Sequence, residues 1–505
     1  MKNTNRKPET MRRARATVFV LVMMVGVIIG VGRVSAAGNY EVQWNKNFGG
    51  SNWESFYSVV LTTDGGYIAV GHSESTDQDL EGLSANELGA IIVKYDKDGD
   101  KEWSKYFGGS NGAHFSSITL AVDGGYVATG CSLSTDQDLA GLNKGYADAI
   151  IVKYDKDGNR EWNKNFGGSS WDCFRSVATT TDGGYIVAGE SHSTDQDMAG
   201  LHKGGYIYGV VVKYNIDGEV EWKNSFGGSE MDALERIAAT SDGGGVAVGH
   251  SYSTDQDLAG LNKGGSDAII GKYDKDGNEE WNKNFGGAES DAFWGIVESK
   301  DGGYVAVGES YSTDQDLTDL NKGDGDDGAA IIVKYDRDGN KEWNKNFGGI
   351  GWEYFTGVAA TEDGGYVAVG ASDSTDGDMA GLLFKGFCDA LIVKYDKYGN
   401  REWGKYFGGS DNDLFESVVI TEDGGYVAVG FSNSIDQDLM GLNKGESDAI
   451  IVKYMATPVL TDTTTDVVNA PDTGVGGRLT LLMIVLGEVA FVVVGIAVFF
   501  KVRET

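Results

Sequence analysis

Seven Asp-x-Asp motifs recur along this chain of 505 residues, each inside a similar Ser-Thr-rich segment. Carboxylates beside serine hydroxyls and backbone carbonyls are the oxygen ligands that Ca²⁺ takes in sets of about six to eight. The same side chains can instead cap turns by accepting hydrogen bonds from nearby backbone N–H groups, and their presence in every copy favours that interpretation. Ca²⁺ is the one cofactor that the sequence suggests. The pairs are Asp77/Asp79, Asp136/Asp138, Asp195/Asp197, Asp255/Asp257, Asp314/Asp316, Asp376/Asp378 and Asp436/Asp438.

A second motif puts one acidic residue shortly after a Phe-Gly-Gly sequence. Three of these acids follow a tryptophan, and aromatic rings beside carboxylates commonly bind carbohydrate by stacking and hydrogen bonding. The alternative is that the tryptophans fill gaps between repeats and the acids are solvated. The acids are Glu54, Asp172, Asp232, Asp291, Glu353 and Asp413, with Ala113 as the exception, and the tryptophans are Trp53, Trp171 and Trp352.

No arrangement of a nucleophile and a base emerges, so no catalytic residue is predicted. The five histidines are scattered through non-equivalent positions. Two acids of the second motif could still hydrolyse a glycoside, which requires two carboxyl groups about 5 to 10 Å apart. Cys131 and Cys173 should lie near one face of neighbouring repeats, where one disulfide is conceivable, but unpaired buried thiols are the favoured interpretation of three cysteines.

The spacing of seven tryptophans defines the elements that position these residues. They recur every 59 to 62 residues, at Trp44, Trp103, Trp162, Trp222, Trp281, Trp343 and Trp403. Each period contains four short β-type runs and Asp-Gly hairpin signals, which is typical of one propeller blade. The tryptophan run comes first in the chain and is missing from the last set. We therefore predict an all-β, seven-bladed propeller closed by pairing of Glu41–Phe48 with Ala449–Tyr454.

The connectivity of the repeat also predicts two faces. The Asp-Gly-Gly and Asp-x-Asp-Gly hairpins should share one end of the propeller, while the Phe-Gly-Gly and Asp-x-Asp loops share the other. The second face carries the longer loops, and loops on a rigid scaffold commonly carry function. Residues present in every copy should serve packing, so binding residues are expected where the copies differ.

Both ends of the chain have the character of export and anchoring segments. Basic residues precede an apolar run and a small-residue cleavage site within residues 1–37, which predicts a signal peptide. Residues 38–455 form the predicted propeller and 456–474 a Thr-rich linker. Residues 475–505 are predicted to be a transmembrane anchor with a basic tail, because Leu479–Phe500 is long and apolar enough to cross a bilayer.

Ala470-Pro-Asp-Thr-Gly474, followed by an apolar segment and a basic tail, resembles the wall-sorting signal of Gram-positive-type bacteria. That resemblance implies cleavage by a sortase between Thr473 and Gly474, although Ala470 stands where leucine is usual. The repeats themselves, with Trp-x-Lys-x-Phe-Gly-Gly and Asp-Gly-Gly-Tyr, resemble a family of bacterial and archaeal cell-surface propellers. This second resemblance covers residues 41–454 and implies extracellular binding.

The net charge of −34 argues against binding to nucleic acid or to an anionic lipid surface. The sequence therefore predicts a cell-surface propeller, anchored to membrane or wall, that binds an extracellular glycan or protein without catalysis. A surface glycoside hydrolase that uses two of the acids is the alternative.

Overall fold

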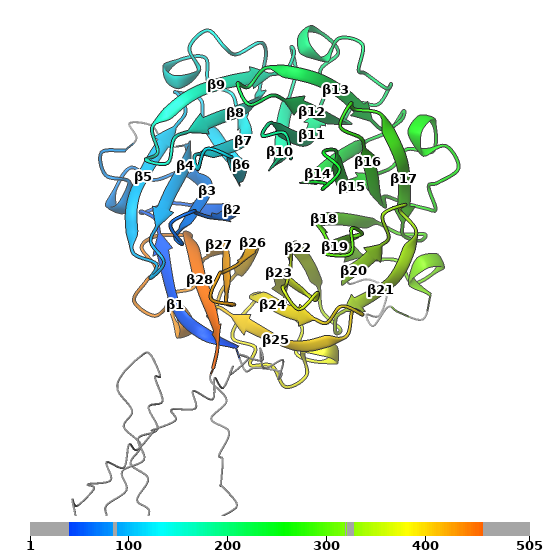
Figure 1. The fold of residues 1–505 in the computed structure, drawn as a ribbon. Coiled ribbons are helices and arrows are strands. Elements are labelled where there is room, and N and C mark those ends of the chain that lie inside the picture. Colours follow the sequence, from blue (N-terminus) through cyan, green and yellow to red (C-terminus); the bar gives the residue numbers. More distant parts are fainter. Residues whose placement is uncertain (1–39, 84–87, 319, 321–327, 458–505) are drawn as a thin grey trace, which may run out of the picture. The chain divides into compact units, whose positions relative to one another are not determined.

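Short β-branched runs separated by glycine turns fold into seven four-stranded antiparallel sheets, arranged as blades around a central axis (Figure 1). The computed structural model describes residues 40–83, 88–318, 320 and 328–457. The predicted all-β, seven-bladed propeller is confirmed.

The two inner strands of each blade lie nearest the axis. The innermost strands are β2 (Glu54–Leu61), β6 (Ala113–Leu120), β10 (Asp172–Thr179), β14 (Asp232–Ala239), β18 (Asp291–Glu298), β22 (Glu353–Ala360) and β26 (Asp413–Ile420). The second strands are β3 (Tyr67–Ser73), β7 (Tyr126–Ser132), β11 (Tyr185–Ser191), β15 (Gly245–Ser251), β19 (Tyr304–Ser310), β23 (Tyr366–Ser372) and β27 (Tyr426–Ser432).

The two outer strands complete each blade. The third strands, which are buried apart from the last two residues of β28, are β4 (Gly89–Tyr95), β8 (Asp148–Tyr154), β12 (Tyr208–Tyr214), β16 (Asp267–Tyr273), β20 (Ala329–Tyr335), β24 (Asp389–Tyr395) and β28 (Asp448–Ala456). The outer strands, which carry the repeated tryptophan, are β1 (Tyr40–Phe48), β5 (Lys101–Phe107), β9 (Arg160–Phe166), β13 (Val220–Phe226), β17 (Glu279–Phe285), β21 (Lys341–Phe347) and β25 (Arg401–Phe407).

The ring closes as predicted, because the first strand of the chain completes the last blade. β1 pairs antiparallel with β28, from Tyr40 opposite Ala456 to Phe48 opposite Ala449. Figure 1 shows the blue β1 beside the orange β28. The Tyr40 ring also stacks on Trp403 of the preceding blade, with ring centroids 5.0 Å apart. Closure pairs the edge of β28 that would otherwise be exposed, and it leaves β1 as the outer strand of the blade.

The repeated residues pack neighbouring blades together. The tryptophan of one blade lies against the Asp-x-Asp-Gly turn of the next: a Cβ on Gly277 would come within 2.7 Å of the Trp222 ring, and Gly277 has a φ of +86°. The lysine of each third strand is buried among carboxylates. Lys213, for example, pairs with Asp182 and Glu221, each at 3.0 Å. These contacts recur around the ring, which is why the sequence repeats them.

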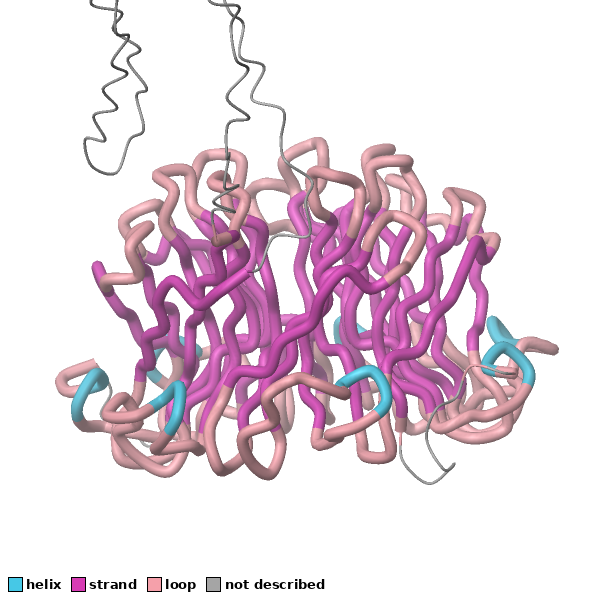
Figure 2. The backbone as a smooth tube through the Cα atoms, turned by 90° about the horizontal axis from the view of Figure 1, so that it is seen from below, coloured by secondary structure: helices cyan, strands magenta, loops and turns pink. Residues whose placement is uncertain are grey.

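Long loops and short hairpins lie at opposite ends of the propeller, as expected from the connectivity (Figure 2). Each long loop contains a 3-10 turn, drawn in cyan. The turns are η1 (Gln78–Leu80), η2 (Gln137–Leu139), η3 (Gln196–Met198), η4 (Gln256–Leu258), η5 (Gln315–Leu317), η6 (Gly377–Met379) and η7 (Gln437–Leu439).

One part of the predicted fold is wrong. The prediction added a C-terminal transmembrane helix to the propeller, but within the described ranges no helix is long and apolar enough to cross a membrane. The helices there are 3-10 turns of three residues, whereas a span requires about 20 apolar residues. Leu479–Phe500, residues 1–37 and the Thr473-Gly474 bond lie outside the described residues.

Candidate functional site

A β-bulge on each innermost strand turns one side chain toward the propeller axis. In β2, Phe56 pairs with Gly71 and Ser58 with Val70, so Tyr57 between them has no partner across the ladder. The same shift occurs at the fourth residue of all seven innermost strands. Bulges commonly re-aim a side chain beside a site. The bulged residues are Tyr57, Ser116, Arg175, Glu235, Trp294, Thr356 and Glu416.

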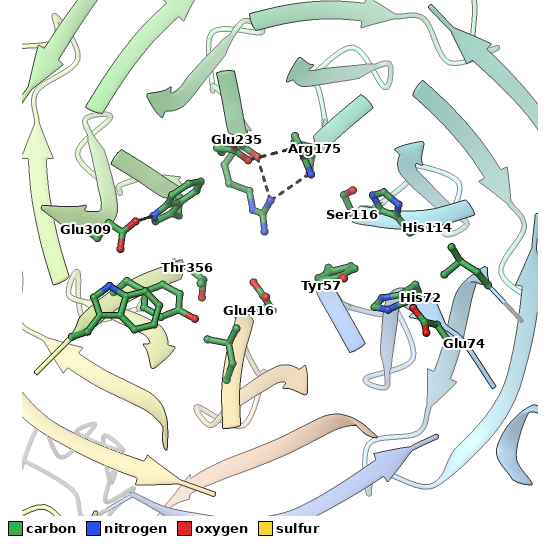
Figure 3. Close-up of a pocket in the computed structure, with 16 residues that line it drawn as sticks. Tyr57, His72, Glu74, His114, Ser116, Arg175, Glu235, Glu309, Thr356 and Glu416 are labelled. Atoms are coloured by element: carbon green, nitrogen blue, oxygen red, sulfur yellow. Dashed lines mark hydrogen bonds and ion pairs between the residues drawn. The ribbon is translucent and has the colours of Figure 1, made fainter. Parts of the chain in front are cut away.

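These seven side chains line one cavity of about 660 Å³ in the centre of the ring (Figure 3). Its size falls within the range of small-molecule sites. His72, Glu74 and Leu88 also line it, and they belong to the end of β3 and the loop that follows. The cavity therefore lies toward the end of the propeller that carries the long loops.

Aromatic rings cover one side of the cavity. The ring of Trp352 stacks on Tyr354 with centroids 4.4 Å apart, and its Nε1 donates to the Tyr311 hydroxyl at 2.9 Å. Trp294 Nε1 donates to Glu309 at 3.3 Å. These hydrogen bonds fix both indoles by their edges. Fixed indoles suit stacking against a flat apolar face of a ligand.

Two arginines and several carboxylates supply the polar part of the wall. Arg175 pairs with Glu190 at 2.6 Å and lies 4.0 Å from Glu235. Arg236 donates to the backbone carbonyl of Arg175 at 3.4 Å. Burial raises the pKa of Glu416 to about 7 although the charge of Arg236 opposes this, so Glu416 changes protonation near neutral pH.

A buried nitrogen of the wall, His72 Nδ1, has no hydrogen-bond partner among the described residues. Burial lowers the pKa of this imidazole to about 4, so the ring is neutral at pH 7. An unsatisfied buried nitrogen is costly, and a ligand or water in the cavity would satisfy it.

The three tryptophans predicted as a platform lie at three different blade interfaces. Trp53 is 47% exposed and donates to Glu446 at 2.6 Å. Trp171 forms a β-bridge with Ala147 and contacts the Tyr146 ring, with centroids 6.1 Å apart. Trp352 lines the central cavity. The structure therefore brings only Trp352 of these three to the cavity wall.

The six predicted acids are the first residues of the innermost strands, directly after the loop that joins consecutive blades. Each is at most 1% exposed and accepts a hydrogen bond from the backbone N–H of the second glycine of Phe-Gly-Gly. Burial raises the pKa of Asp291 and Asp413 to about 6 and that of Glu353 to about 7. None of the six lines the central cavity. They are Glu54, Asp172, Asp232, Asp291, Glu353 and Asp413.

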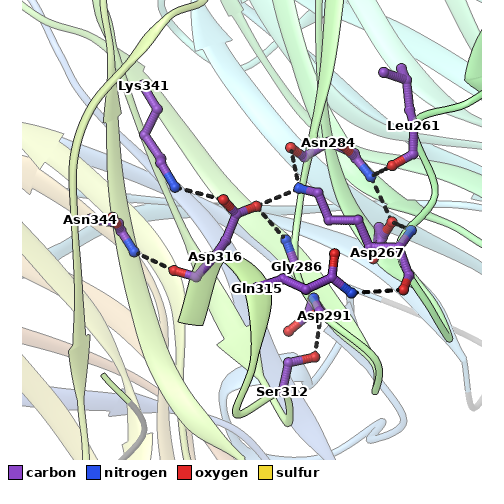
Figure 4. A network of polar contacts seen from close by, with 12 residues as sticks. Leu261, Asp267, Asn284, Gly286, Asp291, Ser312, Gln315, Asp316, Lys341 and Asn344 are labelled. Atoms are coloured by element: carbon purple, nitrogen blue, oxygen red, sulfur yellow. Dashed lines mark hydrogen bonds and ion pairs between the residues drawn. The ribbon is translucent and has the colours of Figure 1, made fainter. Parts of the chain in front are cut away.

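The Asp-x-Asp side chains connect the long loop to the Phe-Gly-Gly loop in every blade. Figure 4 shows one copy, in which Asp316 accepts from the backbone N–H of Gly286 and from Lys341. Gln315, between the two aspartates, adopts a φ of +50° and donates to the carbonyl of Lys263 in the preceding blade. The first glycine of Phe-Gly-Gly donates in the same way, at 3.1 to 3.2 Å, to the second aspartate of every copy, namely Asp79, Asp138, Asp197, Asp257, Asp316, Asp378 and Asp438.

Cationic side chains also contact most of these second aspartates. Asp138 pairs with Arg160 at 2.8 Å, and Asp257 pairs with Lys203 at 3.0 Å. A lysine or arginine in this position neutralises the carboxylate and takes the place that a cation would need. The other pairs of this kind are Asp79 with Lys101 and Lys444, Asp197 with Lys144, Asp316 with Lys263 and Lys341, and Asp438 with Lys385.

The first aspartate of each pair likewise accepts from the backbone. Its partner is the N–H of the residue that follows Phe-Gly-Gly, at 2.8 to 2.9 Å in all seven copies. These contacts close the inter-blade loop against the long loop, as turn-capping carboxylates do. The first aspartates are Asp77, Asp136, Asp195, Asp255, Asp314, Asp376 and Asp436.

The contacts of these pairs are those of turn-capping carboxylates. The aspartates accept from N–H donors in every blade, including Asp138, Asp197, Asp257, Asp378 and Asp438. Among the described residues, no Asp-x-Asp side chain belongs to a group of three acidic, His or Cys residues with ligand atoms within 4.8 Å of one another. Ca²⁺ binding at these pairs, which would use serine hydroxyls and backbone carbonyls as well, stays a prediction.

The sequence did contain a signal for the cavity residues. The fourth residue of the innermost strand takes six identities in seven copies, with glutamate in two of them, and it follows a position that is phenylalanine in six copies, such as Phe56 and Phe415. The acids and the tryptophans of the second motif lie three and four positions earlier, so they indicated the beginning of the strand instead.

Comparisons with known proteins add little to this geometry. No family model matches the chain. A regulatory protein, FlaEY of Caulobacter vibrioides, is 26% identical over 223 residues, which cover 42% of this chain and 23% of that protein. The chain thus spans under a quarter of that relative's length.

Several solved structures match most of the chain at TM-scores below 0.5. The Pan2 WD40 domain of Neurospora crassa has a TM-score of 0.44 at 8% identity, covering 83% of this chain and 96% of that chain. Hydrazine synthase of Kuenenia stuttgartiensis has a TM-score of 0.46 at 10% identity, covering 81% and 97%. A BBS1N chain crystallised with ARL6DN has a TM-score of 0.43 at 9% identity, covering 84% and 99%. None of these similarities identifies a ligand.

Proposed function

We propose that this protein is a binding propeller that holds a saccharide in its central cavity. The observation that carries the proposal is the bulge position, where a strongly repetitive scaffold presents six types of side chain from seven strands to one space. Packing between blades favours the same residue in every copy, so this variation at the cavity wall indicates an asymmetric ligand.

The composition of the wall supports a saccharide as that ligand. Trp294 and Tyr57 offer ring faces, while Glu416, Glu74 and Arg175 offer acceptors and donors for hydroxyl groups. A concave site of about 660 Å³ suits one or a few sugar units better than the flat surface of a folded protein.

We also propose that the propeller works outside the cell, attached to the wall through Thr473. The signal-like residues 1–37 and the Pro-Asp-Thr-Gly motif support this location. A Thr473→Ala variant should disappear from purified wall fragments. Equal amounts of variant and unaltered protein in those fragments would contradict wall attachment.

A glycan array with the purified propeller identifies the ligand, and two tryptophan variants locate it. Trp294→Ala removes a cavity ring and should weaken the affinity for the identified saccharide about fivefold or more, since a stacking contact contributes about 1 kcal/mol. Trp53→Ala, which removes an exposed ring outside the cavity, is the matched control and should leave the affinity within about twofold.

The opposite pattern, with the loss confined to Trp53→Ala, would move the site to the blade interfaces. Release of shorter sugars during the incubation would instead show that the protein is a hydrolase. Melting temperatures of both variants establish that each has folded.

A further inference from the structure

Three side chains that commonly bind metal ions meet beside the cavity, in the wall between two blades. His114 on β6 lies directly across the ladder from Cys131 on β7, and Cys173 comes from β10 of the next blade. The two sulfur atoms are 2.7 Å apart. His114 Nε2 is 3.6 Å from Cys131 Sγ and 3.9 Å from Cys173 Sγ.

The repeat does not require this cluster. The positions equivalent to His114 hold Ser55, Ala233 and Leu414 in other blades, so the fold forms without it. The whole chain has three cysteines and five histidines, and two of the cysteines and one histidine converge here. In the part of the chain that the structure describes, no other group of three His, Cys, Asp or Glu residues brings its ligand atoms within 4.8 Å of one another.

Both sulfur atoms of the cluster belong to buried cysteines. A thiol releases its proton when it binds a metal ion, and the thiolate is the form that acts as the ligand. The cluster therefore has the chemistry of a metal site once an ion enters.

The position of His114 distinguishes a metal site from a disulfide as the interpretation of this cluster. A disulfide needs the sulfur atoms to approach to about 2.05 Å and gives a neighbouring imidazole no role. Two thiolates on one tetrahedral ion need them to separate by about an ångström, with the imidazole as a further ligand. The Nε2 atom lies within 4 Å of both sulfur atoms, on the side where such an ion would bind.

We propose that His114, Cys131 and Cys173 bind one thiophilic metal ion, Zn²⁺ or Cu⁺, in the wall of the central cavity. Two cysteines and one histidine form a ligand set that suits either ion. His114 itself lines the cavity. A three-ligand site at this place leaves a coordination position open toward the cavity, for water or for an oxygen atom of a bound molecule.

Metal binding can be measured on the whole propeller without knowing its ligand. The protein is purified with a non-thiol reductant, loaded with Zn²⁺, dialysed and analysed for metal per chain. We expect one ion per chain, and Co²⁺ loading should give the absorption of thiolate-to-cobalt charge transfer. Cys131→Ser and Cys173→Ser should each weaken Zn²⁺ affinity by about a hundredfold or more, because each removes a ligand.

Cys388→Ser is the matched control. Cys388 is the third cysteine, lies outside the cluster and is partly exposed, so its replacement should leave the metal content at one ion per chain. Equal metal content in the unaltered protein and in Cys131→Ser would overturn the proposal. So would a Cys131–Cys173 disulfide that persists in the reduced protein, detected as a linked peptide by mass spectrometry. Melting temperatures separate loss of the site from loss of the fold.

Discussion

The first and the fourth residues of the innermost strands follow opposite rules, although they are three positions apart. The first residue is a buried carboxylate in six of seven blades and accepts the same glycine N–H each time. The fourth residue lies at a bulge, faces the cavity and takes six different identities in the seven blades. The inter-blade loops are therefore scaffold, and the cavity wall is the part of the molecule free to specify a ligand.

The exceptional blade supports this division. In the blade that begins with β6, Ala113 replaces the carboxylate, and the Ser132 hydroxyl donates to the carbonyl of Gly112 instead. A lost scaffold residue is thus compensated by another local hydrogen bond. The bulge positions show no comparable repetition, since Tyr57 in β2 and Glu416 in β26 differ in size and in charge.

Deleting β1 should have the largest effect, because it removes the scaffold element that closes the ring. Without Tyr40–Phe48, β28 loses its partner strand and the stack of Tyr40 on Trp403 disappears. We expect the truncated propeller to melt far below the full one or to aggregate. A chain that starts at residue 39 is the control, and similar melting curves for the two would contradict closure by β1.

Lowering the pH should stabilise the scaffold through its buried acids. Burial raises the pKa of Asp291 and Asp413 to about 6 and those of Glu353 and Asp389 to about 7. The folded state then binds more protons than the unfolded state, so stability is greatest below the unfolded pKa of about 4 for these groups and falls as the pH rises toward 7.

Acids whose pKa is lowered in the folded state limit this gain in stability at low pH. Despite partial burial, hydrogen bonds with Lys94 and Thr62 lower the pKa of Asp64 to about 2, so its contribution to stability is lost below about pH 4. We expect the melting temperature to rise by roughly several degrees from pH 7.5 to pH 5. A melting temperature that stays constant or falls over that interval would show that these acids are not held protonated by burial.

Glycine variants distinguish crowding at the blade interface from backbone strain. Gly277→Ala introduces a Cβ that contacts Trp222 at a φ of +86°, and should destabilise by about 2 to 5 kcal/mol. Gly424→Ala has a similar φ of +82° with nothing within 4 Å, and should cost only about 1 to 2 kcal/mol. Denaturant unfolding measures both, and equal losses would show that the tryptophan contact adds nothing.

Cavity substitutions should have the smallest effect on stability. Glu416→Gln removes a carboxyl whose charge is disfavoured by burial, so the unfolding free energy at pH 7.5 should change by less than about 1 kcal/mol. A loss as large as that of Gly277→Ala would place Glu416 in the scaffold and abolish the contrast between the two regions.

The sequence predicted the scaffold well because scaffold contacts repeat. The tryptophan period identified seven blades, and the unpaired first run identified closure by β1. The cavity was not predicted, since a bulge changes which residue of a strand faces the axis and alternation alone does not reveal it. The sequence placed Cys131 and Cys173 near one face of neighbouring blades, but it did not single out His114, which lies 17 residues before Cys131 and approaches both cysteines only in the folded ring.

A crystal structure of the propeller with the saccharide identified on the array tests the division most directly. The account predicts sugar density inside the ring, with a pyranose face against Trp294 and hydroxyl groups hydrogen-bonded to bulge-position side chains from several blades, Glu416 among them. Sugar bound instead at Trp53 or Trp171, with the cavity filled by water, would contradict the assignment of the variable positions to ligand binding.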